Sequence, residues 1–148
     1  LAARHDRRTF RDGVVEVGSA HSVDATFERL VAAVEGRAPL SVEATFDHAA
    51  NAERVGLALP PTKVLAFGHP QMTAPLIEDA PTLALDLPLK MLVYRAADGT
   101  TRIAYNDPFF LARRHALSDQ RSRLRVLHDT LTRLAATAAG LDDPVATH

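Results

Sequence analysis

Residues that could do acid–base or binding chemistry stand at the points where the hydrophobic runs of this sequence stop. Asp47-His48 closes one run, Gly68-His69-Pro70 closes a second, and Asn106-Asp107-Pro108 closes another. Asp86 and Lys90 lie at the start of a further run. Strand ends of one sheet can converge in space, so these residues could line a single pocket. Such a pocket would combine carboxylates, an ammonium group, an amide and imidazoles.

Asp86 and Lys90 are the pair with the strongest potential for chemistry. Pro88 restricts Leu87 to extended geometry. In an extended segment Asp86 and Lys90 point to one face, and the leucines between them point inward to the other. Two interpretations stay open. The pair is either a solvated ion pair worth about 0–1 kcal/mol, or a partly buried lysine with a shifted pKa that acts as a base or forms a Schiff base.

Helix caps and turns offer a second explanation for the other residues at run ends. Asp47 can cap a short helix over 48–55, and Asp107 can cap a helix that begins at Pro108. Asn106 suits a turn. His48 follows a carboxylate, which can fix an imidazole tautomer. Neighbours in a strand point apart, however, so a surface or packed histidine is the simpler explanation.

Several classes of chemistry have no motif in the chain. It contains no Gly-x-Ser-x-Gly elbow, no Walker loop and no dinucleotide glycine fingerprint. The histidines and acids lack a compact metal-ligand spacing, so we expect no metal and no cofactor. No residue is assigned a catalytic role, and whether the protein is an enzyme stays open.

The composition predicts one domain without a marked charge. The chain has 148 residues, a formal net charge of −1 and no cysteine. Because aromatics do not interleave with the arginines of the last third, we expect no nucleic-acid partner. No run reaches the ~18 apolar residues of a membrane span, so no membrane partner is expected. We expect a cytoplasmic protein, and an exported one stays open because the first residue is Leu rather than Met.

The order of strands and helices predicts an α+β domain over residues 13–140, with a flexible lead-in at 1–12 and a disordered tail at 141–148. The expected strands lie near 14–17, 41–47, 64–67, 89–95 and 101–105. The principal helices follow Ser22 and Ser118 as N-caps, and Gly36 and Gly140 end them. The 41–47 strand alternates, with Val42, Ala44 and Phe46 toward the core. Around Asp98-Gly99 we expect a hairpin turn.

Several segments resemble a known family, the bacterial domain of unknown function 302. They match in order from about Val14 to Leu134, which makes the resemblance specific. The segments are Phe46–Ala52 with Gly56, Pro61–Lys63, Phe67–Pro70, Thr73–Leu76, Ala84–Val93, Tyr105–Pro108, Leu111-Ala112 and Arg114-His115.

The resemblance implies a β-α-β(4)-α fold of the TATA-binding-protein-like type, with one mainly antiparallel sheet, two principal helices on one face, and homodimers. It implies no settled activity. This sequence departs from the family at His69, where Asn is usual, and at Gln71, where Lys is usual. The residues that match, and that we take as candidate ligand-binding residues, are Asp47, His48, Asn51, Asp86, Lys90, Asn106 and Asp107.

The functional hypothesis is a homodimer that binds a small polar ligand at a strand-end cleft formed by these residues. One alternative is an enzyme with acid–base or lyase chemistry centred on Lys90 and Asp86. The other is a non-enzymatic interaction or dimerisation module, in which Pro75-Leu76, Leu85 and Leu87 bury against a second copy.

Overall fold

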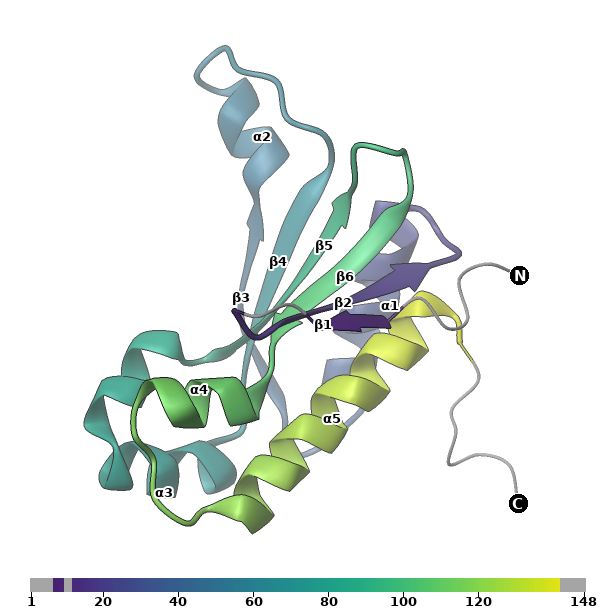
Figure 1. Ribbon diagram of the computed structural model, residues 1–148. Coiled ribbons are helices and arrows are strands. Elements are labelled where there is room, and N and C mark those ends of the chain that lie inside the picture. The colour runs from purple at the N-terminus through teal and green to yellow at the C-terminus, as the bar shows by residue number, and fades with distance from the viewer. Residues whose placement is uncertain (1–6, 10–11, 142–148) are drawn as a thin grey trace, which may run out of the picture.

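A six-stranded antiparallel sheet and two long helices form the body of the protein in the computed structural model, which describes residues 7–9 and 12–141 (Figure 1). The strands are β1 (Arg7–Thr9), β2 (Val14–Ser19), β3 (Ser41–Asp47), β4 (Thr62–Gly68), β5 (Leu89–Arg95) and β6 (Thr101–Asn106). The helices are α1 (Val23–Glu35), α2 (His48–Glu53), α3 (Pro70–Asp79), the 3₁₀ helix η2 (Pro81–Asp86), α4 (Pro108–Arg114) and α5 (Arg121–Ala139). The predicted α+β class is confirmed, and β1 is an addition to the predicted strands.

The strands lie in the order β1-β2-β6-β5-β4-β3, and every neighbouring pair is antiparallel. The hairpin between β5 and β6 turns at Gly99, which has a φ of 84° and donates its N–H to the Ala96 carbonyl. A positive φ is accessible to glycine without steric cost, so the predicted Asp-Gly turn is confirmed.

The core lies between one face of the sheet and the helices α1 and α5, which also pack against each other. The buried face of α1 carries Leu30 and Val34, and Ser22 caps this helix by accepting the Ala25 N–H. The long helix α5 buries a stripe at helical spacing and ends at Gly140 in the left-handed conformation. The leucines of that stripe are Leu124, Leu127, Leu131 and Leu134.

Strand β3 contains a β-bulge that changes which side chains face the core. Val42 pairs with Phe67, but the register shifts before Ala44, which pairs with Ala66. A one-residue shift turns every later side chain to the other face of a sheet. The expectation that Phe46 faces the core is therefore wrong, and its side chain is 45% exposed.

The segment before β5 is helical where the sequence predicted an extended chain. Asp86 ends the 3₁₀ helix η2, and Leu87 is the first residue with extended geometry. The leucines do not all point inward either, because Leu85 is 76% exposed whereas Leu89 is buried. The prediction that Asp86 and Lys90 share one face of an extended segment is therefore wrong.

The ends of the chain differ from the sequence-based expectation in two respects. Arg7–Thr9, within the predicted lead-in, pairs with β2 as strand β1. Ser118 does not cap α5, which begins at Arg121; the Ser118 hydroxyl instead donates to the Asp79 carboxylate. Residues 1–6, 10 and 11 of the predicted lead-in lie outside the described residues. The same is true of residues 142–148 of the predicted tail.

Candidate functional site

The structure places the candidate residues at opposite ends of the sheet. Lys63 on β4 pairs with Asp47 on one side and with Val93 on the other. Lys90 lies three residues before Val93 on β5, a separation of about 10 Å along the strand. Its strand is two strand spacings from that of Asp47, with β4 between them, which adds about 10 Å across the sheet. Figure 1 shows the same division, with α2 at one end of the sheet and α3 and α4 at the other.

The two groups have different members. Asp47, His48 and Asn51 belong to the end formed by β3 and α2. The other end holds Asp86, Lys90, Asn106 and Asp107. The register of β3, β4 and β5 does not bring all the candidates into a single cleft. The two groups are therefore separate candidate sites.

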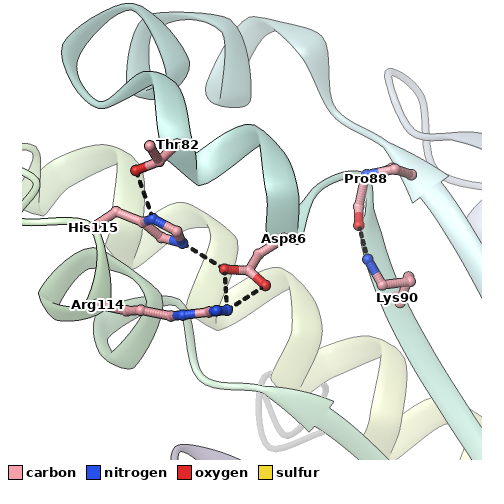
Figure 2. Close-up of polar contacts among 6 residues, drawn as sticks. All are labelled: Thr82, Asp86, Pro88, Lys90, Arg114 and His115. Atoms are coloured by element: carbon pink, nitrogen blue, oxygen red, sulfur yellow. Dashed lines mark hydrogen bonds and ion pairs between the residues drawn. The ribbon is translucent and has the colours of Figure 1, made fainter.

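Asp86 is held by two side chains from the end of α4, Arg114 and His115 (Figure 2). The Arg114 guanidinium donates to both carboxylate oxygens at 2.8 Å, and Nε2 of His115 lies 2.5 Å from Oδ2. The Asp86 side chain is 16% exposed and that of His115 only 5%. Both oxygens of the carboxylate are thus engaged, which leaves little capacity to bind a ligand.

His115 extends this network to η2. Its Nδ1 lies 2.8 Å from the Thr82 hydroxyl (Figure 2), so the imidazole connects two residues of the same 3₁₀ helix. An imidazole whose Nε2–H donates to a carboxylate has a free lone pair on Nδ1, which accepts from a hydroxyl. This arrangement joins η2 to α4, and we call Thr82, Asp86, Arg114 and His115 the Asp86 cluster.

The electrostatics of the Asp86 cluster favour an ionised carboxylate. Burial alone would raise the pKa of the Asp86 carboxyl group. The hydrogen bond from His115 and the charge of Arg114 outweigh this effect, so the net pKa is lowered. The carboxylate therefore acts as an anchor rather than as a proton donor near neutral pH.

Lys90 does not belong to the Asp86 cluster. Its side chain is exposed, and Nζ donates to the Pro88 carbonyl at 3.2 Å, whereas Asp86 turns to α4 (Figure 2). An enzyme that used Lys90 as a base or Schiff-base former would need a desolvated ammonium group. The structure therefore gives no support to acid–base or lyase chemistry centred on Lys90 and Asp86.

Asn106 and Asp107 lie where β6 passes into α4. The Asp107 carboxylate accepts the Phe109 N–H at 2.9 Å, and its own N–H donates to the Gly13 carbonyl. Asp107 is thus the N-cap of α4, as the position before Pro108 predicted. Asn106 is half-buried and pairs with Val14 on β2.

At the other end of the sheet, the residues around α2 are largely exposed. The Asp47 carboxylate accepts the Ala50 N–H at 2.9 Å and caps α2, as predicted. The His48 ring stacks on Phe46 with 6.4 Å between the ring centroids. Asn51 is exposed on α2.

A hollow of about 500 Å³ lies beside α2, and we call it the α2 groove. Asp47 is the one sequence-predicted residue among those that form it. Its lining is mixed, with apolar side chains next to acids and one lysine: Asp24, Asp47, Ala49, Ala50, Glu53, Leu57, Ala58, Leu59, Pro61 and Lys63.

Lys63 supplies the positive charge of the α2 groove. Its Nζ lies 2.9 Å from the Asp24 carboxylate and 5.6 Å from the centroid of the Phe27 ring. The hydrogen bond to Asp24 raises the pKa of Lys63, and partial burial opposes this only in part. Asp24 therefore neutralises Lys63, so that Asp47 and Glu53 leave the groove with an excess of negative charge.

Some of these residues could not be chosen from sequence alone. Arg114 and His115 stand about thirty positions after Asp86, and no periodicity connects them. The signal that contained them was the Arg114-His115 segment of the family resemblance.

Within the described part of the chain, no group of three or more His, Asp or Glu residues could hold a metal ion. No described helix has both the length and the apolar character needed to cross a membrane.

The fold and the site describe a small α+β domain, and one protein family matches it. The family model described as "Domain of unknown function DUF302" matches residues 15–138, so the chain belongs to this family. The solved structure of an uncharacterised conserved DUF302 protein from Bacillus stearothermophilus is similar to it, with a TM-score of 0.75 and 20% identity. The alignment covers 85% of this chain and 98% of that one, which shows the shared fold.

Curated relatives match a shorter part of the chain. A protein named fluoride-specific ion channel FluC 1 from Brucella suis biovar 1 (strain 1330) is 41% identical over 105 residues, which is 71% of this chain and 41% of that protein. The protein of the same name from Brucella abortus biovar 1 (strain 9-941) is also 41% identical over 105 residues, 38% of its length. The chain therefore spans about two fifths of the length of these relatives.

Proposed function

We propose that this domain binds a small polar ligand in the α2 groove. The observation that carries the proposal is the groove itself, because it joins a sequence-predicted carboxylate, Asp47, to a hollow of about 500 Å³. Ligand pockets typically have volumes of about 300–1,000 Å³ and combine apolar walls with a few polar groups. The α2 groove meets both conditions, whereas the Asp86 cluster has its polar atoms satisfied internally.

The lining of the groove indicates the character of the ligand. Leu57 and Leu59 are 66% and 51% exposed, so an apolar part of a ligand would cover surface that now faces water. Asp47 and Glu53 offer acceptor oxygens, since one carboxylate can accept several hydrogen bonds. The ligand that fits is therefore a small molecule with hydrogen-bond donors at one end and an apolar part at the other.

The test begins with purification under native conditions and mass spectrometry of any small molecule that copurifies. Binding of the molecule found is then measured by calorimetry on the wild type and on Asp47→Asn, which keeps the cap of α2 but removes the charge. Asp107→Asn is the matched control, because Asp107 also caps a helix and lies outside the groove. Loss of binding in Asp47→Asn alone supports the proposal; equal binding in all three proteins contradicts it.

A second proposal is that the protein forms a homodimer through the exposed apolar side chains near α2. Phe46, Val55, Leu57 and Leu59 are between 45% and 72% exposed. Contiguous exposed apolar surface is often an interaction site. The dimer surface expected from sequence needs correction, because Leu76 is only 1% exposed and already packs in the core of its own chain.

Size-exclusion chromatography with light scattering at micromolar concentration tests the dimer. We expect twice the monomer mass for the wild type and the monomer mass for Leu57→Ser combined with Leu59→Ser. The control is Leu85→Ser, which removes an even more exposed leucine, 76% exposed, at the other end of the sheet. A monomeric wild type rejects the homodimer and leaves the ligand proposal to its own experiment.

A further inference from the structure

A second, smaller hollow lies at the opposite end of the sheet from the α2 groove. It has a volume of about 130 Å³ and lies where β3 and β4 meet the start of α3. We call it the His69 pocket. Its lining residues are Glu43, Phe67, Gly68, His69, Pro70, Thr73, Pro88 and Leu89.

The imidazole in this pocket is buried without a partner for one of its nitrogens. His69 is 7% exposed, and in the described part of the chain its Nδ1 has no hydrogen-bond partner. The backbone carbonyl of the same residue is satisfied, since it accepts the N–H groups of Met72 and Thr73. A buried polar atom of this kind costs free energy, and an additional ligand is one of the few explanations for its retention.

Two features of the backbone bring a carboxylate to the same pocket. Glu43 is the extra residue of the β3 bulge, and bulges redirect the side chain that they carry. Gly68 then makes room for it, because a Cβ atom on Gly68 would lie 2.6 Å from Oε1 of Glu43. Bulge and glycine together place an acceptor-only group in the lining of the pocket that also holds the unsatisfied imidazole.

The Glu43 carboxylate and the start of α3 set the charge around the pocket. The first turn of α3 contributes Pro70 and Thr73 to the lining, and a helix N-terminus carries a partial positive charge. Glu43 adds a full negative charge to the lining, which this partial charge offsets only in part. The remaining walls, Phe67, Leu89 and the prolines, are apolar. The pocket therefore disfavours a free anion and suits a molecule with a hydrogen-bond donor and a short apolar part.

We propose that the His69 pocket binds the hydroxyl group of a small neutral molecule, independently of the α2 groove. A hydroxyl both donates and accepts a hydrogen bond. It can therefore donate to Glu43 and pair with Nδ1 of His69, which is itself a donor or an acceptor according to the tautomer. A ketone lacks the donor that Glu43 requires, and a carboxylate brings a second negative charge beside that of Glu43. An ammonium group has no lone pair, so it cannot accept a hydrogen bond from an Nδ1–H of His69.

The experiment follows the ring nitrogens of His69 by NMR in the full-length, ¹⁵N-labelled protein. The probe is 2-propanol, and acetone, isopropylammonium chloride and sodium acetate are titrated separately as matched probes of similar shape. We expect a saturable shift of the His69 nitrogens with 2-propanol in the millimolar range, at least a fivefold weaker effect with acetone and acetate, and no tighter binding of isopropylammonium. His128 on α5, remote from the pocket, reports any unspecific effect of solvent.

Variants connect the signal to the pocket. Glu43→Gln should weaken 2-propanol binding about tenfold, because a hydrogen bond to a charged acceptor is lost. Glu35→Gln, an exposed glutamate at the end of α1, should leave binding unchanged. The proposal is overturned by an unshifted His69, by equal binding to Glu43→Gln, by shifts that His128 shares, or by tighter binding of acetone, the ammonium ion or acetate. Glu43 is exposed, so its substitution leaves the fold in place.

Discussion

The two ends of the sheet use the same kinds of residue in opposite ways. In the Asp86 cluster, one carboxylate meets a guanidinium and an imidazole, and the imidazole meets a hydroxyl, so the polar atoms satisfy one another. In the α2 groove, Asp47 accepts one hydrogen bond as a helix cap, and Leu57 and Leu59 are exposed to solvent. The difference separates a polar group that stabilises the fold from one that retains capacity for a ligand.

This comparison explains why residue type is a poor guide to a site. Asp86 and Lys90 have the residue types of an ion-paired centre, yet they do not contact each other. Asp86 pairs with Arg114 and His115, and Lys90 donates to the Pro88 carbonyl. What distinguishes a site is the number of hydrogen bonds left unmade and the surface left uncovered. Variants at both ends of the sheet can test that distinction.

The largest effect on stability is expected for Asp86→Ala. Removal of the carboxylate leaves Nε2 of His115, whose side chain is 5% exposed, without its partner, and the free energy of unfolding should fall by about 2–3 kcal/mol. Urea denaturation gives the value. Asp129→Ala is the matched control, because Asp129 also pairs with a histidine, His128, but is 53% exposed, and its loss should cost no more than about 0.5 kcal/mol. Equal losses in both variants would contradict the role of the Asp86 cluster.

The pH dependence of stability should carry the signature of Asp86. The pKa of its carboxyl group is lowered in the folded protein, so the folded state binds this proton less readily than the unfolded state. The stabilisation is therefore fully present above the unfolded pKa, near 3.9, and is lost as the pH falls through the lower folded pKa. Urea denaturation between pH 5.5 and 2.5 should show a steeper loss for the wild type than for Asp86→Asn. Parallel curves would mean that Asp86 is not held by Arg114 and His115.

A smaller effect is expected at the α2 end, where Asp47→Ala should cost about 1 kcal/mol through the lost cap. Asp47→Asn should be close to neutral for stability, because Asn caps a helix as well as Asp does. Thermal unfolding of both variants separates capping from charge. If Asp47→Asn lost as much stability as Asp47→Ala, the carboxylate would have a structural partner beyond the Ala50 N–H, and the groove would resemble the Asp86 cluster.

The sequence predicted most of the fold because its signals are local. Ser22, Asp47 and Asp107 were identified as helix caps, and the Asp98-Gly99 turn as a hairpin, from chemistry that acts within a few residues. The order of strands and helices predicted from these signals agrees with the order that the family resemblance implies.

The errors have non-local causes. The bulge at Glu43 follows from the pairing of β3 with β4, and no pattern within 41–47 reveals it. The helical turn that ends at Asp86 is held by Arg114 and His115 from α4, and the extended geometry that Pro88 imposes begins only at Leu87. The candidate site was divided for the same reason: whether strand ends converge depends on the register of the sheet.

The smallest effect is expected for Lys90→Ala, and it is also the sharpest test of the comparison. Lys90 stood beside Asp86 in the sequence, but its exposed ammonium group contacts one backbone carbonyl, at Pro88. Truncation of an exposed side chain of this kind changes the free energy of unfolding by no more than about 0.5 kcal/mol. In a double-mutant cycle with Asp86→Ala, the coupling energy should be close to zero, because the two residues share no partner. A coupling above about 1 kcal/mol would mean that Lys90 and Asp86 interact in solution, and it would return the charged pair to the list of candidate sites.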